Sequence, residues 1–293
     1  MTYFSPTDLL INPDGSSYHL NLRPDQIPDL FILVGDPERV PLVSQFFDEI
    51  TEMVHKREFV THLGILKGKK IGVLSSGIGA DNVEIVMNEL DALVNIDFVT
   101  RLEKSEKRSL KLIRIGTSGS IQAHIPVDSI LISKAAIGFD NLAQFYGFDS
   151  AQSIPENVLA LWTKAIDYPF PLYAAKASAA LLAQFTLLDA FRGVTLTAPG
   201  FYAPQGRTIR MKSLRPDFLQ KVAESKLADQ EITNIEMETA AYYAFAGAMG
   251  HEMISLNAIL ANRITQEFSK DPEGQIMSLI EKAIDIIASH NRP

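Results

Sequence analysis

Short apolar runs rich in Val, Ile and Leu alternate along this chain with longer segments in which apolar residues recur at helical spacing. The runs that predict strands are residues 31–34, 70–76, 110–116, 129–137, 194–197 and 253–260. The segments that predict helices are residues 37–47, 81–93, 157–166, 236–249 and 274–288. Because strands that alternate with helices build layered folds, we expect a single-domain α/β/α protein of three layers with a mixed central β-sheet.

Composition excludes several function classes. The chain has no cysteine, so disulfides, thiolate nucleophiles and Cys-ligated zinc are excluded. Its net charge of −8 argues against a general nucleic-acid or membrane-surface binder, both of which need a basic face. We expect a cytoplasmic protein, since no secretory signal is recognisable and no apolar run reaches the length of about 20 residues that a membrane span needs.

The segment LVGDPERV, residues 33–40, ends a predicted strand and begins a predicted helix. Gly35 permits a sharp turn, Asp36 is a suitable cap for a helix that Pro37 opens, and Arg39 follows in the first turn. Free N–H groups beside a guanidinium suit an anion. Taken alone, the segment fits an ordinary capped helix with a surface arginine equally well.

The segment RIGTSGSI places Arg114 at the end of a predicted strand. Gly116 and Gly119 bracket Thr117 and Ser118, so we expect two hydroxyls and exposed amides on a tight turn. Ligands of α/β sheets bind beyond the carboxyl ends of strands, and a buried arginine needs an anionic partner. That partner is either a ligand or an internal carboxylate.

The segment PGFYAPQGRT carries an aromatic residue, Phe201, followed by Gln205 and Arg207. Glutamine offers a donor and an acceptor, and arginine offers donors only. This set matches the edge of a pyrimidine, on whose ring Phe201 could stack. The alternative is a Pro/Gly loop with a packed aromatic side chain.

The segment NIEMETAAYYAFA places Glu236 and Glu238 on either side of Met237, at the start of an apolar helix. Acidic residues are favoured near a helix N-terminus by the helix dipole. A carboxylate at this place could instead bind the paired hydroxyls of a sugar.

Taken in order, these segments resemble the nucleoside phosphorylase family, and within it the uridine branch. GDPER, RIGTSG and EMET are specific for the family, and FYAPQGR and LANR for the branch. The resemblance implies reversible phosphorolysis of uridine to uracil and ribose 1-phosphate in nucleoside salvage. It covers a phosphorylase domain of residues 16–293, after an N-terminal extension of residues 1–15 that is longer than usual. A charged insert at 101–109, which we expect to be a solvated loop or helix end, also departs from the family pattern.

The resemblance also implies the site residues. The phosphate site comprises Gly35, Arg39, Arg114, Thr117 and Arg57 of the partner subunit. The ribose site comprises Thr117, Met237, Glu238 and His19 of the partner subunit. The base site comprises Phe201, Gln205, Arg207 and Arg263. Arg114, Thr117, Gln205 and Arg207 carry the chemistry.

The resemblance further implies a homo-oligomer in which two subunits share each active site, so that a dimer is the smallest active unit. The members of the family form trimers or hexamers. Inorganic phosphate is the co-substrate, and neither a cofactor nor a nucleic-acid or membrane partner is expected. Some members hold potassium at the subunit interface. Glu58 is the matching ligand, but Asn82 stands where a hydroxyl residue is often found. A potassium ion at Glu58 of the dimer interface therefore stays open, and no other metal ion is expected.

Three alternatives remain open at this point. In the purine branch an Asp, which protonates the leaving base, lies in the region of LANR, where this chain has Asn262 and Arg263. A nucleosidase would use water instead of phosphate. A ligand-binding or scaffold protein on the same fold would bind nucleoside without turnover.

Overall fold

The computed structural model describes residues 2–148, 153–227 and 229–290. Its helices are α1 (Arg39–Ser44), α2 (Ala80–Asn95), α3 (Glu156–Ala165), α4 (Ala179–Gln184), α5 (Phe218–Glu224), α6 (Thr239–Met249) and α7 (Pro272–His290). Its strands are β1 (Leu30–Val34), β2 (Glu49–Lys56), β3 (Phe59–Leu66), β4 (Lys69–Ser75), β5 (Ile96–Asp97), β6 (Leu102–Glu103), β7 (Lys111–Ser120), β8 (Ile130–Gly138), β9 (Tyr173–Lys176), β10 (Phe191–Thr197), β11 (Lys226–Leu227), β12 (Gln230–Glu236), β13 (Glu252–Asn262) and β14 (Glu267–Phe268).

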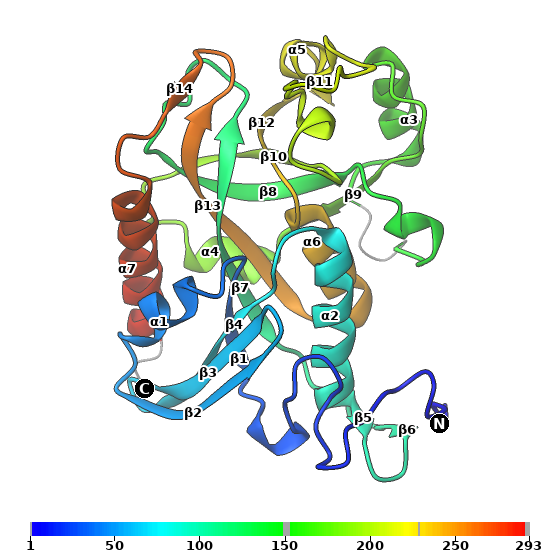
Figure 1. Ribbon diagram of the computed structural model, residues 1–293, viewed down its shortest axis with the longest axis vertical. Coiled ribbons are helices and arrows are strands. Elements are labelled where there is room, and N and C mark those ends of the chain that lie inside the picture. The colour runs from blue at the N-terminus through cyan, green and yellow to red at the C-terminus, as the bar shows by residue number, and fades with distance from the viewer. Residues whose placement is uncertain (1, 149–152, 228, 291–293) are drawn as a thin grey trace.

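One large mixed sheet organises the molecule (Figure 1). Its strand order is β11-β12-β10-β8-β13-β7-β1-β4-β3-β2, with β9 paired to β8 and β14 paired to β13. Strand β1 is parallel to both β4 and β7, whereas β3 and β2 continue the sheet in antiparallel register. Because β12 also pairs with β7, the strands β12, β10, β8, β13 and β7 close a ring of pairings. The predicted mixed sheet is confirmed.

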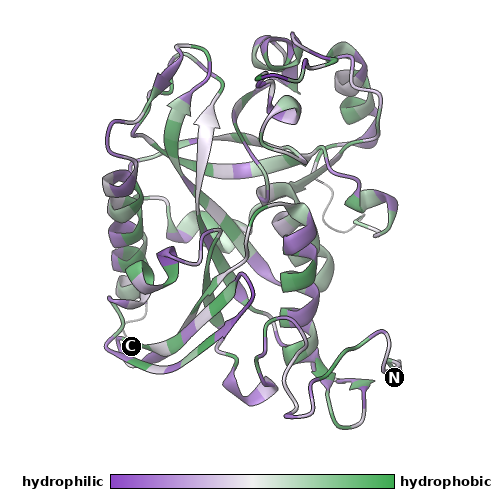
Figure 2. Cartoon of the chain, viewed as in Figure 1, coloured by the Kyte–Doolittle hydropathy of each residue, from purple (hydrophilic) through white to green (hydrophobic). Residues whose placement is uncertain are grey.

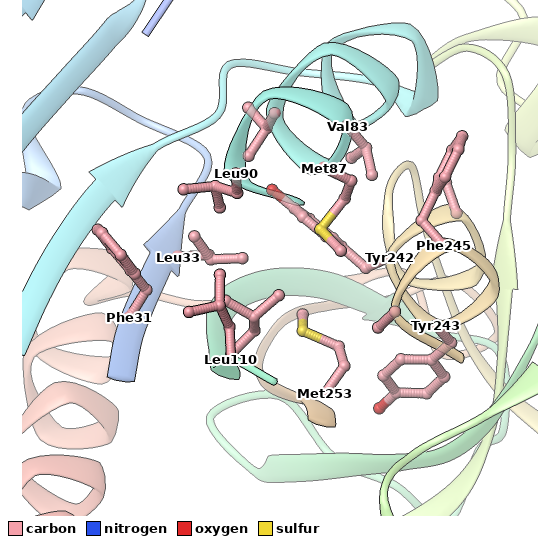
Figure 3. Close-up of a cluster of buried hydrophobic side chains, with 14 of the residues drawn as sticks. Phe31, Leu33, Val83, Met87, Leu90, Leu110, Tyr242, Tyr243, Phe245 and Met253 are labelled. Atoms are coloured by element: carbon pink, nitrogen blue, oxygen red, sulfur yellow. The ribbon is translucent and has the colours of Figure 1, made fainter. Parts of the chain in front are cut away.

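Both faces of β1 are buried, as its unbroken apolar run predicts. Phe31 and Leu33 pack into one core cluster with α2 and α6, and Ile32 and Val34 pack into a second cluster with α1 and α7. Figure 3 shows the first cluster, in which α2 and α6 face the strand residues. Along α2 and α7 polar and apolar residues alternate, while the central strands are largely apolar (Figure 2). The helices therefore cover the sheet from both sides.

Strand β7 differs most from the sequence prediction. It does not stop at Gly116 but continues to Ser120, because its second half pairs with β13 and its end also pairs with β12. The expected tight turn at Gly116–Gly119 is therefore wrong, and Arg114 lies in the middle of the strand. Non-local hydrogen bonds, which no local pattern reveals, extend this strand.

Two predicted helices begin later than expected. Helix α6 begins at Thr239, because Glu236 is still the last residue of β12. Helix α1 begins at Arg39, not at Pro37, and the side chain of Asp36 accepts a hydrogen bond from the Glu38 amide in the turn before it. Arg39 nevertheless lies in the first helical turn, as predicted.

The charged insert at 101–109 is a solvated loop only in part: residues 104–109 lie outside helices and strands and are largely exposed, whereas its first residues are ordered by pairing. It contains β6 and pairs with the N-terminal segment, since Tyr3 bridges to Leu102 and the Phe4 amide donates to the Arg101 carbonyl at 3.0 Å. The Arg101 guanidinium in turn donates to the Leu9 carbonyl at 2.7 Å. The two departures from the family pattern thus form one unit. The domain division after residue 15 stays a prediction, and its outermost residues, 1 and 291–293, lie outside the described residues.

Among the described residues, no helix is long and apolar enough to cross a membrane.

Candidate active site

A cavity of about 780 Å³ brings the predicted segments together. Nine of the residues predicted for the phosphate, ribose and base sites line it, namely Gly35, Arg39, Arg114, Thr117, Phe201, Gln205, Arg207, Met237 and Glu238. They come from β7, from the segments that follow β1, β10 and β12, and from the first residue of α1. Segments up to about 200 residues apart in the chain thus converge, as expected for a ligand site in an α/β sheet.

Arg114 is the buried charge at the floor of this cavity, with only 4% of its surface exposed. Its Nη2 donates to Oε2 of Glu238 at 2.6 Å and lies 3.4 Å from Oε2 of Glu236. Burial alone lowers the pKa of Arg114, but the two carboxylates outweigh it and raise the pKa above its ordinary value. The internal carboxylate, one of the two sequence alternatives, is therefore the observed partner of Arg114. Arg114 also lines the cavity, so a ligand can reach it.

Glu236 is held by the start of α6. Its oxygens accept hydrogen bonds from the amides of Glu238 and Thr239, from the Thr239 hydroxyl, and from the Thr197 hydroxyl at 2.6 Å. The carboxylate is saturated by these protein donors. It therefore acts as a fixed support for Arg114, although it also lines the cavity.

Glu238 connects Arg114 of β7 to the turn at Gly79 that precedes α2. Its Oε1 accepts from the amide of Gly79 at 2.7 Å, where φ of +98° favours glycine, while its Oε2 accepts from Arg114. Burial raises the pKa of Glu238, and Arg114 offsets only part of that rise. A carboxylate has about four lone-pair positions, so Glu238 keeps acceptor capacity for a ligand hydroxyl.

Two groups in the cavity have no protein partner. Within the described residues the guanidinium of Arg39 forms no hydrogen bond or ion pair, and the hydroxyl of Thr117 makes no hydrogen bond. Burial lowers the pKa of Arg39, which the nearby charge of Asp36 partly offsets. A partly buried cation without a partner is costly. The arrangement of Arg39, Thr117 and Arg114 is therefore ready for an anion.

The predicted base residues form a second group of contacts. Nη1 of Arg207 donates to Oε1 of Gln205 at 2.6 Å and to the Phe201 carbonyl at 2.7 Å, while its guanidinium carbon lies 3.9 Å from the centre of the Phe201 ring. Gln205 is buried, and the guanidinium of Arg263 donates to the backbone carbonyl of Gln205 at 3.0 Å. Because the side-chain oxygen of Gln205, Oε1, already accepts from Arg207, the side-chain NH₂ group is left to donate to a ligand.

The charge of Arg207 is not fully balanced by the protein. Burial and the neighbouring charge of Arg263 lower the pKa of Arg207 to about 10. Such a guanidinium is stabilised by any negative charge that develops in front of it.

Three predicted residues do not line the cavity of their own chain, namely His19, Arg57 and Arg263. Arg263 supports the wall through Gln205, as just described. Arg57 lies exposed on the turn between β2 and β3. His19 is held against α2 by Glu89. The resemblance assigned His19 and Arg57 to a neighbouring site, and that assignment stays a prediction.

Sequence reasoning missed several lining residues, of which Ile235, Leu260 and Phe268 supply apolar wall. They belong to strand ends whose position depends on the pairing of β12, β13 and β14. Glu58, the candidate potassium ligand, also lines the cavity together with Asn82. No group of three or more acidic or histidine side chains suited to a metal ion occurs in the part of the chain that is described.

Comparison with known proteins identifies the family. The model of the phosphorylase superfamily matches residues 29–289. The chain belongs to the phosphorylase superfamily. Because the match spans all the lining segments, the protein is a nucleoside phosphorylase, and the family uses phosphate as its co-substrate.

Individual members of the superfamily are similar over nearly their whole length. A uridine phosphorylase of Thermococcus kodakarensis is 30% identical over 94% of this chain and 88% of its own. A DeoD-type purine nucleoside phosphorylase of Bacillus cereus is 27% identical over 92% of this chain and 97% of its own. The crystal structure of a Trypanosoma brucei nucleoside phosphorylase with uridine phosphorylase activity superposes with a TM-score of 0.83 at 27% identity, over 96% and 98% of the two chains. This nucleoside phosphorylase is thus similar to members of both substrate branches.

Proposed function

We propose that this nucleoside phosphorylase is a uridine phosphorylase, which converts uridine and phosphate to uracil and ribose 1-phosphate and catalyses the reverse reaction. The observation that carries the proposal is that the donors Gln205 and Arg207 line the same cavity as the anion-ready group of Arg39, Arg114 and Thr117. A pyrimidine base with two carbonyl oxygens matches the first group, and phosphate matches the second.

In the proposed mechanism, phosphate is the nucleophile and no enzyme residue forms a covalent bond. Arg39, Arg114, Thr117 and the backbone at Gly35 orient phosphate below C1′ of the sugar, and Arg57 of the partner subunit completes the set. Holding the two reactants in this geometry replaces a collision by a positioned attack. A phosphate oxygen bonds to C1′ as the bond from C1′ to N1 of uracil breaks, and the electron pair of that bond leaves with the base.

The leaving uracil gathers negative charge, which spreads to its carbonyl oxygens. The NH₂ group of Gln205 and the guanidinium of Arg207 would donate to these oxygens, while Phe201 stacks on the ring. Arg207, whose pKa is lowered to about 10 by burial and by Arg263, gains most when that charge appears. Contacts that strengthen in the transition state raise the rate rather than the affinity alone.

The ribose would lie between the two groups, where Glu238 accepts from its hydroxyls and Met237 packs beside it. His19 of the partner subunit would reach the 5′-hydroxyl. The proposed assembly is therefore a homo-oligomer with a dimer as its smallest active unit. We further propose a cytoplasmic location, and Glu58 is the residue that would bind a potassium ion at the subunit interface.

Purine nucleoside phosphorylase is the second candidate, because purine enzymes are among the similar proteins. A purine leaving group needs a proton donor. The side chain of Asn262, in the region where the purine branch has an Asp, is buried and donates to the carbonyls of Gln122 and Ile125 at 3.0 and 2.9 Å. It is not a lining residue of the cavity. This favours the pyrimidine branch.

An assay of uridine, thymidine and inosine, each with and without phosphate, tests the proposal. We expect the highest kcat/KM for a pyrimidine nucleoside and no base release without phosphate. Inosine activity above uridine activity would favour the purine branch. Base release in the absence of phosphate would indicate a nucleosidase, and nucleoside binding without turnover would indicate a non-enzymatic role.

A further inference from the structure

The segment that carries His19 is bound to α2 by hydrogen bonds to one carboxylate, that of Glu89. Glu89 of α2 accepts from the backbone amide of His19 at 2.9 and 3.1 Å, one distance for each oxygen. It also accepts from the amide of Leu20 at 2.9 Å. Leu20 is fully buried in the cluster beside α2, so the backbone at this point is fixed from both sides.

The same carboxylate orients the imidazole ring. Nδ1 of His19 lies 2.7 Å from Oε1 of Glu89. Because a carboxylate only accepts, Nδ1 must carry the hydrogen, and in the neutral ring Nε2 then carries the lone pair. Nε2 forms no hydrogen bond within the described part of the chain, and the side chain is 25% exposed. The ring thus presents one defined atom, Nε2, away from α2.

We propose that Glu89 is a positioning residue that fixes His19 so that Nε2 accepts a hydrogen bond from the 5′-hydroxyl of a nucleoside bound in the adjoining subunit. This inference rests on the proposed function, which supplies the nucleoside and the place of His19 beside its ribose. Glu89 is not a lining residue of the cavity of its own chain, so its effect is exerted through His19.

The neighbours of the ring fit this role. The Tyr18 ring packs edge-on against His19 with its centre 4.8 Å away, and the ammonium of Lys56 lies 5.0 Å from the centre of Tyr18. Tyr18 therefore limits rotation of the imidazole on one side, and Glu89 holds it on the other. Such outer partners keep a hydrogen-bonding histidine in one tautomer and one orientation.

The test compares two substrates in one preparation of each variant. Glu89→Gln keeps the side-chain size but replaces one acceptor oxygen by an NH₂ group, which faces N–H donors. We expect kcat/KM for uridine to fall about tenfold, as for the loss of one oriented hydrogen bond. We expect kcat/KM for 5′-deoxyuridine, which lacks the hydroxyl, to equal that of the wild type. Because the ratio of the two substrates is measured in one preparation, any loss of folded enzyme cancels.

Two further variants complete the experiment. Glu281→Gln, an exposed carboxylate on α7, is the matched control and should change neither substrate. In a His19→Ala background, Glu89→Gln should cause no additional loss on uridine, since both act through one hydrogen bond. An equal loss on both substrates, or no loss on uridine, would overturn the inference. Absence of uridine phosphorolysis in the wild type would instead refute the proposed function beneath it.

Discussion

Nη2 of Arg114 and Oε2 of Glu238 lie 2.6 Å apart inside the cavity. In the proposed mechanism Arg114 binds phosphate and Glu238 binds the ribose hydroxyls. The ion pair therefore fixes the phosphate-binding group relative to the ribose-binding group, next to C1′, where the new bond forms. Because Oε2 of Glu236 also lies 3.4 Å from the same Nη2, the pair keeps its geometry before any substrate arrives. A site preorganised in this way needs little rearrangement during the reaction.

Replacing Arg114 by Ala should lower kcat/KM by about 10²–10³-fold, as expected for the loss of one charged transition-state donor. The KM for phosphate should rise, which initial rates at several phosphate concentrations will show. The variant also leaves Glu236 and Glu238 unpaired, so the free energy of unfolding should drop by about 3–5 kcal/mol. Arg108→Ala, which removes an ion pair with Asp29 and a hydrogen bond to the Ile27 carbonyl, is the control for loss of an arginine outside the cavity. An unchanged phosphate saturation curve would remove Arg114 from the phosphate site.

The activity should depend on pH through Glu238. Since burial raises its pKa above the ordinary value of 4.5, Glu238 remains protonated over an acidic range where an exposed Glu is already charged. Only the carboxylate accepts hydrogen bonds from ribose with both oxygens, so kcat/KM should rise with pH through this raised pKa. The measurement is the pH–rate profile of the wild type against Glu238→Gln. Phosphate ionisation affects both enzymes equally, and identical acid limbs would contradict the assignment.

Gln205→Ala should lower kcat/KM for uridine by about 10–10²-fold, because Arg207 and the base both lose a hydrogen-bonding partner. The KM for phosphate should change little, since the side chain of Gln205 bonds to Arg207 and not to Arg39 or Arg114. Steady-state kinetics with each substrate varied in turn will separate the two effects. Equal losses for uridine and phosphate would contradict a role in reading the base.

Asn262→Asp should not create a purine enzyme. Its Nδ2 donates to the Gln122 and Ile125 carbonyls, so an Asp would place oxygen against two oxygens in a buried position. We expect a loss of about 1–3 kcal/mol or more in the free energy of unfolding by urea, with no gain of activity on inosine. Asn157→Asp, exposed in the first turn of α3, is the matched control. A variant as stable as the wild type that gains inosine cleavage would refute this interpretation.

The convergence of Arg39 and Arg114 was predicted through the family resemblance, and the strand pairing gives its physical reason. Both follow or lie within apolar runs that form neighbouring parallel strands, and β1 pairs with β7 so that Leu33 lies opposite Arg114. Local patterns in buried strands are strong because both faces are apolar. The central strands were predicted for this reason, and most helices were predicted because their apolar residues recur at helical spacing.

Other features depend on contacts that no local pattern contains. Strands β2 and β12 were not predicted, since β2 is largely exposed and polar and β12 is recognisable only once it pairs with β10. The position of Glu236 at a strand end, and not in a helix, follows from the same pairing. Glu89 carries no sequence signal, because its role comes from His19, which lies 70 residues away in the chain.

The most direct measurement is the identity of the sugar product that the wild-type enzyme forms from uridine and phosphate. Phosphorus NMR of the reaction mixture follows the phosphate signal while absorbance follows uracil. The account predicts one ribose 1-phosphate for every uracil released and no reaction when phosphate is left out. Formation of free ribose, or uracil release that does not depend on phosphate, would contradict the proposed phosphorolysis of uridine.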